Sequence, residues 1–206
     1  MPRIFKWPAE KPLPQNFLDE LKHTVDNGGV IIYPTTTLYG IGASIHSEEA
    51  IGKIFLLKSR PEGMPLSVMA SSKQIKEICS IPDTFKPFME SSDKRLTAIL
   101  PALEAVPQIM VHNGTLAVRL PCSELTASMI NFIGPVTSTS ANLHGQPTPP
   151  DIETLANRFG DKISLYIDSG KLEGQPTTLV DFTGDEPKII REGALSREEV
   201  ERVNER

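Results

Sequence analysis

Helix-like and strand-like patterns alternate through the first third of the chain. Residues 16–29 carry apolar side chains at helical spacing and end in Asn-Gly-Gly, which is a strong helix stop. Residues 30–37 then have the pattern of a buried strand that runs into a loop. A second helix is predicted from Ser47, a candidate N-cap, to Lys58, and the next strand at 65–70. This order predicts a layered α/β fold.

The rest of the chain is richer in predicted strands. Strand-like segments occur at residues 96–100, 115–121, 135–140, 163–168, 177–183 and 188–192, and helical patterns at 71–80, 124–133 and 151–159. Residues 196–206 predict a short terminal helix that starts with the Ser-x-x-Glu spacing of a capping box. Because no linker divides these segments, we expect residues 1–206 to form one domain with its core at about 12–195 and one mixed sheet.

Composition and charge exclude several classes of protein. The 206 residues are 39% hydrophobic and 23% charged, which is typical of a globular chain with a sizeable core. No apolar run reaches the roughly 20 residues of a membrane span, and the first residues lack the apolar centre of a signal peptide, so we expect a cytoplasmic protein without membrane contact. A net charge of −5 argues against a protein that coats nucleic acid. Cations that bind an anion must therefore be clustered in space.

Cysteine and histidine are too sparse to predict a metal site. Cys79 and Cys122 lie far apart and form no Cys-x-x-Cys pair, so we interpret both as buried small hydrophobic residues. The four histidines never fall at the i, i+4 spacing of a helical metal site, and we interpret them as surface or capping residues. We name no protein ligand for a metal.

Hydroxyl, amide and cationic side chains gather in the segments that end or follow strands. Thr115 and Arg119 lie four residues apart and therefore share one face of a strand. In open α/β sheets such segments converge on a crevice where ligands bind. The convergent cations would be Lys58, Arg60, Arg119 and Arg191. Together with the hydroxyls they predict a pocket for a polyanion, and a nucleoside triphosphate fits that description.

No single motif is enough to predict this polyanion pocket. Threonine is common in strands, and Ser-Thr-Ser before Asn can be a simple turn. No Gly-x-Gly-x-x-Gly and no Gly-x-x-x-x-Gly-Lys-Ser/Thr sequence is present, so neither of those nucleotide-binding loops is supported. Ser140 and His144 lack the nucleophile elbow of a serine hydrolase.

The combination of motifs resembles the YrdC/YciO family, whose main members are threonylcarbamoyl-AMP synthases. The resemblance runs from about Gly28 to Gly193 and rests on five motifs in order: Pro-Thr-x-Thr-x-Tyr-Gly at 34–40, Lys-x-Arg-Pro at 58–61, Val-Arg-Leu-Pro at 118–121, Ser-x-Asn at 140–142, and the segments 177–182 and 189–193. The family implies a large, twisted, mostly mixed β-sheet with flanking helices and a deep concave groove.

The resemblance also implies a reaction. L-Threonine, bicarbonate and ATP would give threonylcarbamoyl-adenylate and pyrophosphate, the first step towards N6-threonylcarbamoyladenosine at position 37 of tRNA. ATP would be a substrate, with Mg²⁺ bound to it. The implied partners include the downstream threonylcarbamoyl-transferase proteins, with tRNA or double-stranded RNA as a candidate ligand.

Site residues follow from the resemblance, position by position. The expected ATP contacts are Lys58, Arg60, Thr115, Ser140, Asn142 and Arg191. Lys58 and Arg60 are also the expected catalytic pair, because they would screen the negative charge of the triphosphate so that the carbamate can approach it. The expected threonine contacts are Thr35, Arg119, Ser138 and Thr177. Arg119 would pair with the threonine carboxylate, because a planar guanidinium fork suits a carboxylate better than an ammonium does.

Two departures from the family pattern keep an alternative open. Met64 and Met69 stand where the family commonly has Asn and His. They favour a YciO-like paralogue that binds RNA or nucleotide in the groove with little synthase activity, whereas the intact Lys-x-Arg and Ser-x-Asn motifs favour the enzyme. A third possibility is a related carbamoyl-adenylate reaction on another acceptor, as in the hydrogenase-maturation proteins that share the core.

Overall fold

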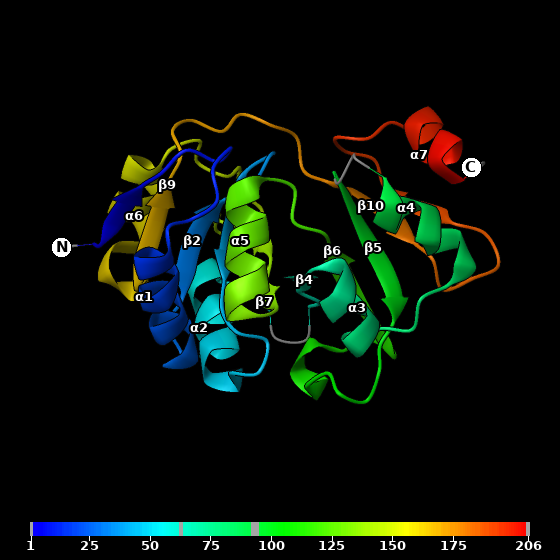
Figure 1. Cartoon of the computed structure of the whole chain (residues 1–206), viewed down its shortest axis with the longest axis horizontal. Coiled ribbons are helices and arrows are strands. Elements are labelled where there is room, and N and C mark those ends of the chain that lie inside the picture. The colour runs from blue at the N-terminus through cyan, green and yellow to red at the C-terminus, as the bar shows by residue number, and fades with distance from the viewer. Residues whose placement is uncertain (1, 62–63, 92–94, 205–206) are drawn as a thin grey trace.

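The chain forms two mixed β-sheets with helices packed around them (Figure 1). The computed structural model describes residues 2–61, 64–91 and 95–204. The arrangement confirms the predicted α/β class of mixed strands with flanking helices. The strands differ from the prediction in that their hydrogen bonds divide them between two sheets instead of one.

The five-stranded sheet has the strand order β1, β9, β2, β3, β8. These strands are β1 (Ile4–Lys6), β2 (Ile31–Pro34), β3 (Tyr39–Gly42), β8 (Thr139–Ser140) and β9 (Leu165–Asp168). The first three strands in this order run parallel, whereas β3 pairs antiparallel with both β2 and β8. Every residue of β2 and β3 is buried, as expected for strands covered on both faces.

The six-stranded sheet has the strand order β11, β10, β5, β6, β4, β7. These strands are β4 (Ser67–Met69), β5 (Leu96–Pro101), β6 (Thr115–Arg119), β7 (Val136–Thr137), β10 (Thr178–Asp181) and β11 (Lys188–Arg191). The pairs β10 with β5 and β4 with β6 are parallel, and the other pairs are antiparallel.

The two sheets meet at Ser138. β7 ends at Thr137 and pairs with β4, whereas β8 begins at Thr139 and pairs with β3, so the chain changes sheets at one residue. Ser138 N donates to Ser67 O at 2.6 Å, and the Ser67 hydroxyl donates back to Ser138 O. The predicted strand at 135–140 is therefore two short strands, one in each sheet.

Strand β3 lies in a segment that the sequence indicated to be a loop. Its two glycines are weak strand formers, but the ring of Tyr33 packs over them from the neighbouring strand. A Cβ atom at Gly40 would lie 3.1 Å from Tyr33 Cζ, and one at Gly42 would lie 2.8 Å from Tyr33 Cε1. Only glycine therefore allows this strand to pair beside a buried tyrosine.

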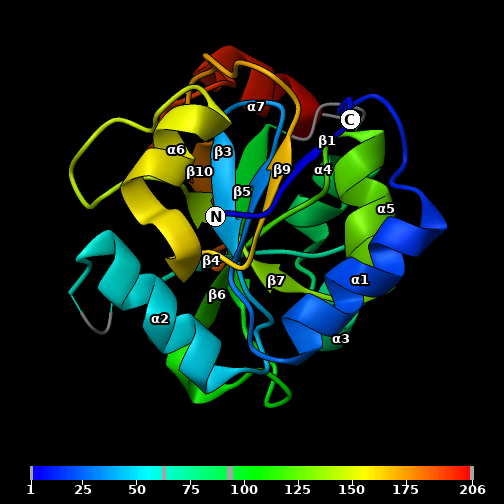
Figure 2. The ribbon, with the colours of Figure 1, turned by 90° about the vertical axis from the view of Figure 1, so that its left-hand side faces the viewer.

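The helices cover both faces of the strands. They are α1 (Gln15–Asp26), α2 (Glu48–Lys58), α3 (Ser72–Ile78), α4 (Lys86–Glu90), α5 (Glu124–Ile133), α6 (Ile152–Phe159) and α7 (Arg197–Asn204), with short 3-10 turns at Asp83–Phe85, Gln108–Met110 and Gly160–Lys162. Figure 2 shows α2 and α6 on one side of the strands and α1 and α5 on the other. Leu21 and Val25 of α1 and Met129 of α5 share one apolar cluster with β2 and β9.

The predicted helix ends are confirmed at two places. The Ser47 hydroxyl accepts from Ala50 N at 3.3 Å and caps α2. Ser196 and Glu199 form the predicted reciprocal hydrogen bonds at the start of α7, at 2.7 and 3.2 Å. Within the described part of the chain, no helix is long and apolar enough to cross a membrane.

Candidate functional site

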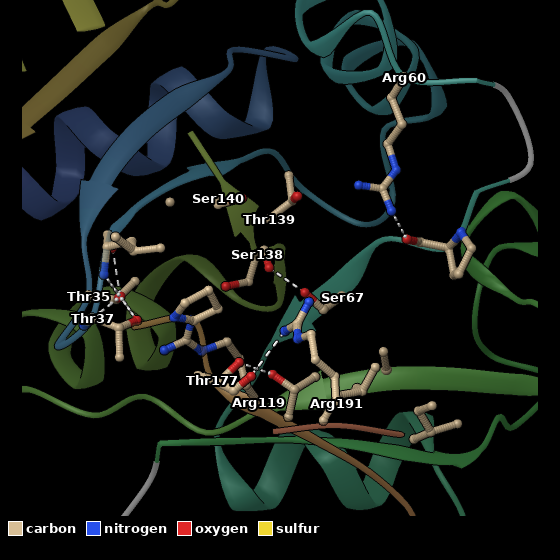
Figure 3. A pocket seen from close by; sticks show the side chains of 18 of the residues that line it. Thr35, Thr37, Arg60, Ser67, Arg119, Ser138, Thr139, Ser140, Thr177 and Arg191 are labelled. Carbon is tan, nitrogen blue, oxygen red and sulfur yellow. Dashed lines mark hydrogen bonds between the residues drawn. The ribbon is translucent and has the colours of Figure 1, made fainter. Parts of the chain in front are cut away.

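A cavity of about 350 Å³ lies where the two sheets meet (Figure 3). One wall comes from the loop between β2 and β3 and from β8, and the other from β4, β5, β6, β10 and β11. Apart from Lys58 and Asn142, all predicted site residues line it: Thr35, Arg60, Thr115, Arg119, Ser138, Ser140, Thr177 and Arg191. Segments more than 150 residues apart in the sequence thus converge on one polar cavity, as predicted.

The cavity is built for an anion. It is lined by the guanidinium groups of Arg60, Arg119 and Arg191, and no Asp or Glu is among the described residues that line it. Arg119 is only 8% exposed, and its Nε has no hydrogen-bond partner within the described residues. A buried guanidinium that lacks a carboxylate partner carries an uncompensated charge, so a ligand carboxylate or phosphate would be bound strongly there.

Arg60 reaches the cavity because α2 ends two residues earlier. Ser59 adopts a left-handed conformation with φ of 49°, and its N–H donates to Leu56 O at 3.1 Å. The chain therefore turns sharply after Lys58. Arg60 Nη2 donates to Pro65 O at 2.7 Å, which holds the guanidinium at the cavity wall, while its buried Nε has no partner among the residues that the structure describes.

Lys58 is buried behind the cavity wall and does not line the cavity. It is 1% exposed, and its Nζ donates to Ser140 O, to Asn142 O at 2.9 Å and to Asn142 Oδ1 at 3.0 Å. The Ser140 hydroxyl also donates to Asn142 Oδ1, at 2.6 Å. The Lys-x-Arg and Ser-x-Asn motifs are thus brought together, with Lys58 and Asn142 holding the segment from which Ser140 faces the cavity.

Burial lowers the pKa of Lys58 to about 7, and the nearby charge of Arg60 is the second, smaller cause. The three oxygen atoms that accept from Nζ oppose this effect, because they stabilise the charged ammonium. Lys58 is therefore a titratable group at the back of an anion-binding cavity.

Hydroxyl groups from both sheets complete the polar wall. Thr35 Oγ1 donates to Leu38 O at 2.7 Å and accepts from Leu38 N at 3.2 Å, so it shapes the turn between β2 and β3. Thr177 Oγ1 lies 2.7 Å from Thr97 Oγ1 in the neighbouring strand. Thr35 thus acts on the shape of the cavity, and the Thr97–Thr177 pair offers hydroxyls at its other wall.

An extended segment, 169–177, connects β9 of one sheet to β10 of the other and passes the rim of the cavity (Figure 1). Gly174 N donates to Thr37 O at 2.9 Å, and this approach is so close that a Cβ at Gly174 would lie 2.5 Å from the same oxygen. A Cβ at Gly193 would lie 2.2 Å from Pro176 O. These two glycines allow the segment to lie against both walls of the cavity.

Several lining residues were missed by the sequence analysis. The polar ones are Ser67, Thr97, His112 and Thr139. Thr97 could have been found, because it alternates with Ile99 in a predicted strand, whereas nothing local places Ser67 at the junction of the sheets. Cys79 is buried, as predicted, but the prediction was wrong for Cys122, which is only partly buried.

A second cavity, of about 640 Å³, adjoins the first and shares Arg60, Pro65 and His112 with it. Its other lining residues are mostly apolar: Gly52, Phe55, Leu56, Ser59, Met64, Gln108, Ile109, Met110 and Val111. Met64 thus belongs to the apolar cavity, and Met69 is fully buried in the core. Neither methionine lines the polar cavity.

The donor set does not fit a resident metal ion. No group of three His, Cys, Asp or Glu residues in the described ranges could hold one. The described lining of the polar cavity offers hydroxyls and guanidiniums, and guanidiniums repel a cation.

Comparison with known proteins agrees with this geometry. The model of the Sua5, YciO and YrdC family, described as "Telomere recombination", matches residues 23–193. This chain belongs to that family. The match covers every residue of both cavities and of the wall behind them.

Individual members of the Sua5/YciO/YrdC family show how close the similarity is. The threonylcarbamoyl-AMP synthase of Pyrococcus abyssi is 34% identical over 189 residues, which are 87% of this chain and 54% of that protein. The crystal structure of P. abyssi Sua5 complexed with L-threonine superposes with a TM-score of 0.88 at 30% identity and covers 98% of this chain and 60% of that one. The chain thus spans little more than half of these relatives.

A shorter member matches along its whole length. The crystal structure of Escherichia coli YciO superposes with a TM-score of 0.86 at 26% identity, and the match covers 95% of this chain and 98% of that one. Structures of the protein HypF are only 18% identical, with TM-scores of 0.74 and 0.76, and show a shared fold alone.

Proposed function

We propose that this protein is an L-threonylcarbamoyladenylate synthase. It would use L-threonine, bicarbonate and ATP to form threonylcarbamoyl-AMP and pyrophosphate for the modification of tRNA. The observation that carries the proposal is the buried guanidinium of Arg119, which faces a hydroxyl-lined cavity and has no carboxylate partner in the described part of the chain. The P. abyssi Sua5 structure with L-threonine, which has the same fold, supports a threonine-binding site in this family.

The cavity supports this chemistry by charge neutralisation. The threonine amine and bicarbonate give a carbamate and water; a carbamate oxygen then attacks the α-phosphorus of ATP, and pyrophosphate leaves. Both reactants are anions, so their approach needs fixed positive charge. In our proposal Arg119 binds the threonine carboxylate, with Thr35, Ser138 and Thr177 around the amino acid, and Arg60 and Arg191 screen the phosphates, with Thr115 and Ser140 beside them. Lys58 and Asn142 do not line the cavity; from behind its wall they hold the segment that carries Ser140.

The second candidate function is nucleotide or RNA binding with little synthesis. The match to E. coli YciO over nearly the whole length of both chains favours it. The buried position of Met69 and the location of Met64 outside the polar cavity weaken it, because neither departure removes a group from the wall of that cavity.

Pyrophosphate release from ATP and bicarbonate, with and without L-threonine, separates the two functions. A synthase releases pyrophosphate only when threonine is present. A folded protein that binds ATP but shows no threonine-dependent release would refute the synthase and leave the binding function.

The nucleoside of ATP is expected to lie in the apolar second cavity, because Arg60 joins that cavity to the polar one. Burial of a flat apolar base should make ATP bind at least about tenfold more tightly than inorganic tripolyphosphate in titration calorimetry. Ile109→Glu should weaken ATP binding by a similar factor and leave tripolyphosphate binding unchanged, since Ile109 lines only the apolar cavity.

Two variants serve as controls for this titration. Arg60→Ala should weaken the binding of both ATP and tripolyphosphate, because the guanidinium lines both cavities. Leu103→Glu alters an equally exposed apolar residue outside both cavities and should change neither. Equal affinities of the wild type for ATP and tripolyphosphate would contradict the placement of the nucleoside.

A further inference from the structure

The sulfur of Cys122 lies between two groups that belong to different sheets. Thr36 Oγ1 donates to Cys122 Sγ at 3.2 Å from the loop between β2 and β3. Arg119 Nη2 donates to the same sulfur at 3.7 Å from the end of β6. The thiol thus connects the two walls of the polar cavity beside Arg119, the most buried arginine of that cavity.

The contact with Cys122 is the one hydrogen bond that the Arg119 guanidinium makes within the described residues. Arg119 is 8% exposed, its Nε is unpartnered, and the described lining of the cavity holds no carboxylate that could orient it. A long side chain without fixed partners loses rotamer entropy when it binds a ligand, so a partner that fixes it beforehand improves affinity.

Cys122 itself is held in a fixed position. Its N–H donates to Thr126 Oγ1 at 3.1 Å, at the capped start of α5. This bond fixes the backbone of Cys122, and the Thr36 hydroxyl contacts the sulfur itself, so the direction of the guanidinium is tied to the start of a helix.

We propose that Cys122 is a positioning residue that orients Arg119 for the substrate carboxylate. This inference rests on the proposed function, in which Arg119 binds threonine. Cys122 touches no reacting atom and does not line the cavity. Its loss should therefore act on threonine affinity, with little effect on turnover at saturating threonine.

The test compares Cys122→Ala and Cys122→Ser in threonine titrations of pyrophosphate release. Alanine removes the acceptor and should raise the KM for threonine roughly three- to tenfold, with kcat changed less than about twofold. Serine restores an oxygen acceptor and should bring KM back towards the wild-type value. Cys79→Ser changes the other, buried thiol and should leave the threonine KM unaltered.

Chemical modification of the folded wild type provides an independent measurement if the alanine variant does not fold. Iodoacetamide forms an S–C bond with the thiolate, iodide leaves and the thiol proton goes to solvent. Cys122 is partly exposed and Cys79 is buried, so alkylation should occur at Cys122 and should raise the threonine KM while ATP affinity stays constant.

The outcomes distinguish this inference from the proposed function. A wild type without any threonine response would overturn the proposed function and, with it, the role of Cys122. A wild type that responds to threonine, together with an unchanged KM in Cys122→Ala or in the alkylated protein, would overturn the positioning role alone. A loss of kcat at unchanged KM would also contradict it.

Discussion

Arg119→Ala is expected to lower kcat/KM for threonine about a hundredfold in the pyrophosphate-release assay. The guanidinium is buried and, over residues 2–61, 64–91 and 95–204, has no carboxylate partner, so in our proposal the substrate carboxylate supplies the missing charge. A charge-assisted, bidentate pair of this kind contributes roughly 3 kcal/mol, which corresponds to about a hundredfold. The loss should appear mainly in KM, because the carboxylate is bound equally before and during the reaction.

Arg119→Lys is the matched variant for this prediction. It keeps the charge but loses the planar fork, so we expect it to recover only part of the affinity. ATP binding, measured by calorimetry, should stay within about twofold in both variants if Arg119 contacts only threonine. A hundredfold loss of ATP affinity with an unchanged threonine KM would place Arg119 at the nucleotide instead.

Lys58→Ala is expected to lower the free energy of unfolding by about 3 kcal/mol. The substitution leaves Ser140 O, Asn142 O and Asn142 Oδ1 without the donor that they share, in a place with almost no access to water. Because Ser140 lines the cavity, ATP affinity should fall as well. Urea denaturation and ATP titration calorimetry measure the two effects.

Lys53→Ala, in the same helix, is the control for this stability measurement. Lys53 is exposed and forms an i, i+4 ion pair with Glu49 at 2.8 Å, which contributes little to stability. Its removal should cost less than about 1 kcal/mol. If Lys58→Ala were no more destabilising than Lys53→Ala, the role of Lys58 as the anchor of the Ser-x-Asn segment would be wrong.

The pH dependence of stability offers a second measurement on Lys58. An ordinary lysine titrates near 10.5, whereas the pKa of Lys58 is about 7 in the folded protein. Between these values the unfolded chain binds more protons than the folded one, so the free energy of unfolding should rise with pH, by up to about 1.4 kcal/mol per pH unit. Lys58→Met should lack this contribution. An identical slope in wild type and variant would show that the three oxygen acceptors keep Lys58 charged.

The junction of the two sheets decides which polar side chains lie opposite one another in the cavity. In one continuous sheet, alternate residues of the segment 135–140 would share a face and point to one side. The change of sheet at Ser138 instead brings the loop after β2 opposite the ends of β6 and β10. Hydroxyls beside the five-stranded sheet thereby face guanidiniums and further hydroxyls beside the six-stranded sheet, an arrangement that in our proposal binds the carboxylate and the amine of threonine.

The sequence alone was sufficient for the fold class and for eight of the residues that line the cavity, the three arginines among them. Helical periodicity and capping motifs are local properties, so they predicted α1, α2 with its cap at Ser47, and the capping box at Ser196. The motifs that carry Arg60, Arg119, Ser140 and Arg191 could be assigned because their residue types and order are specific to a family. All four line the cavity.

Only the tertiary structure decided how the strands divide, where Lys58 lies and what holds Arg119. The division into two sheets depends on hydrogen bonds between Ser67 and Ser138, which are 71 residues apart. Lys58 looks like an ordinary cation at a helix end until the fold places Asn142 beside it. Burial and long-range pairing are sums over distant parts of the chain, whereas local patterns report only on neighbours. For this reason the sequence named Lys58 and Arg119 without their contacts, and it did not name Ser67 at all.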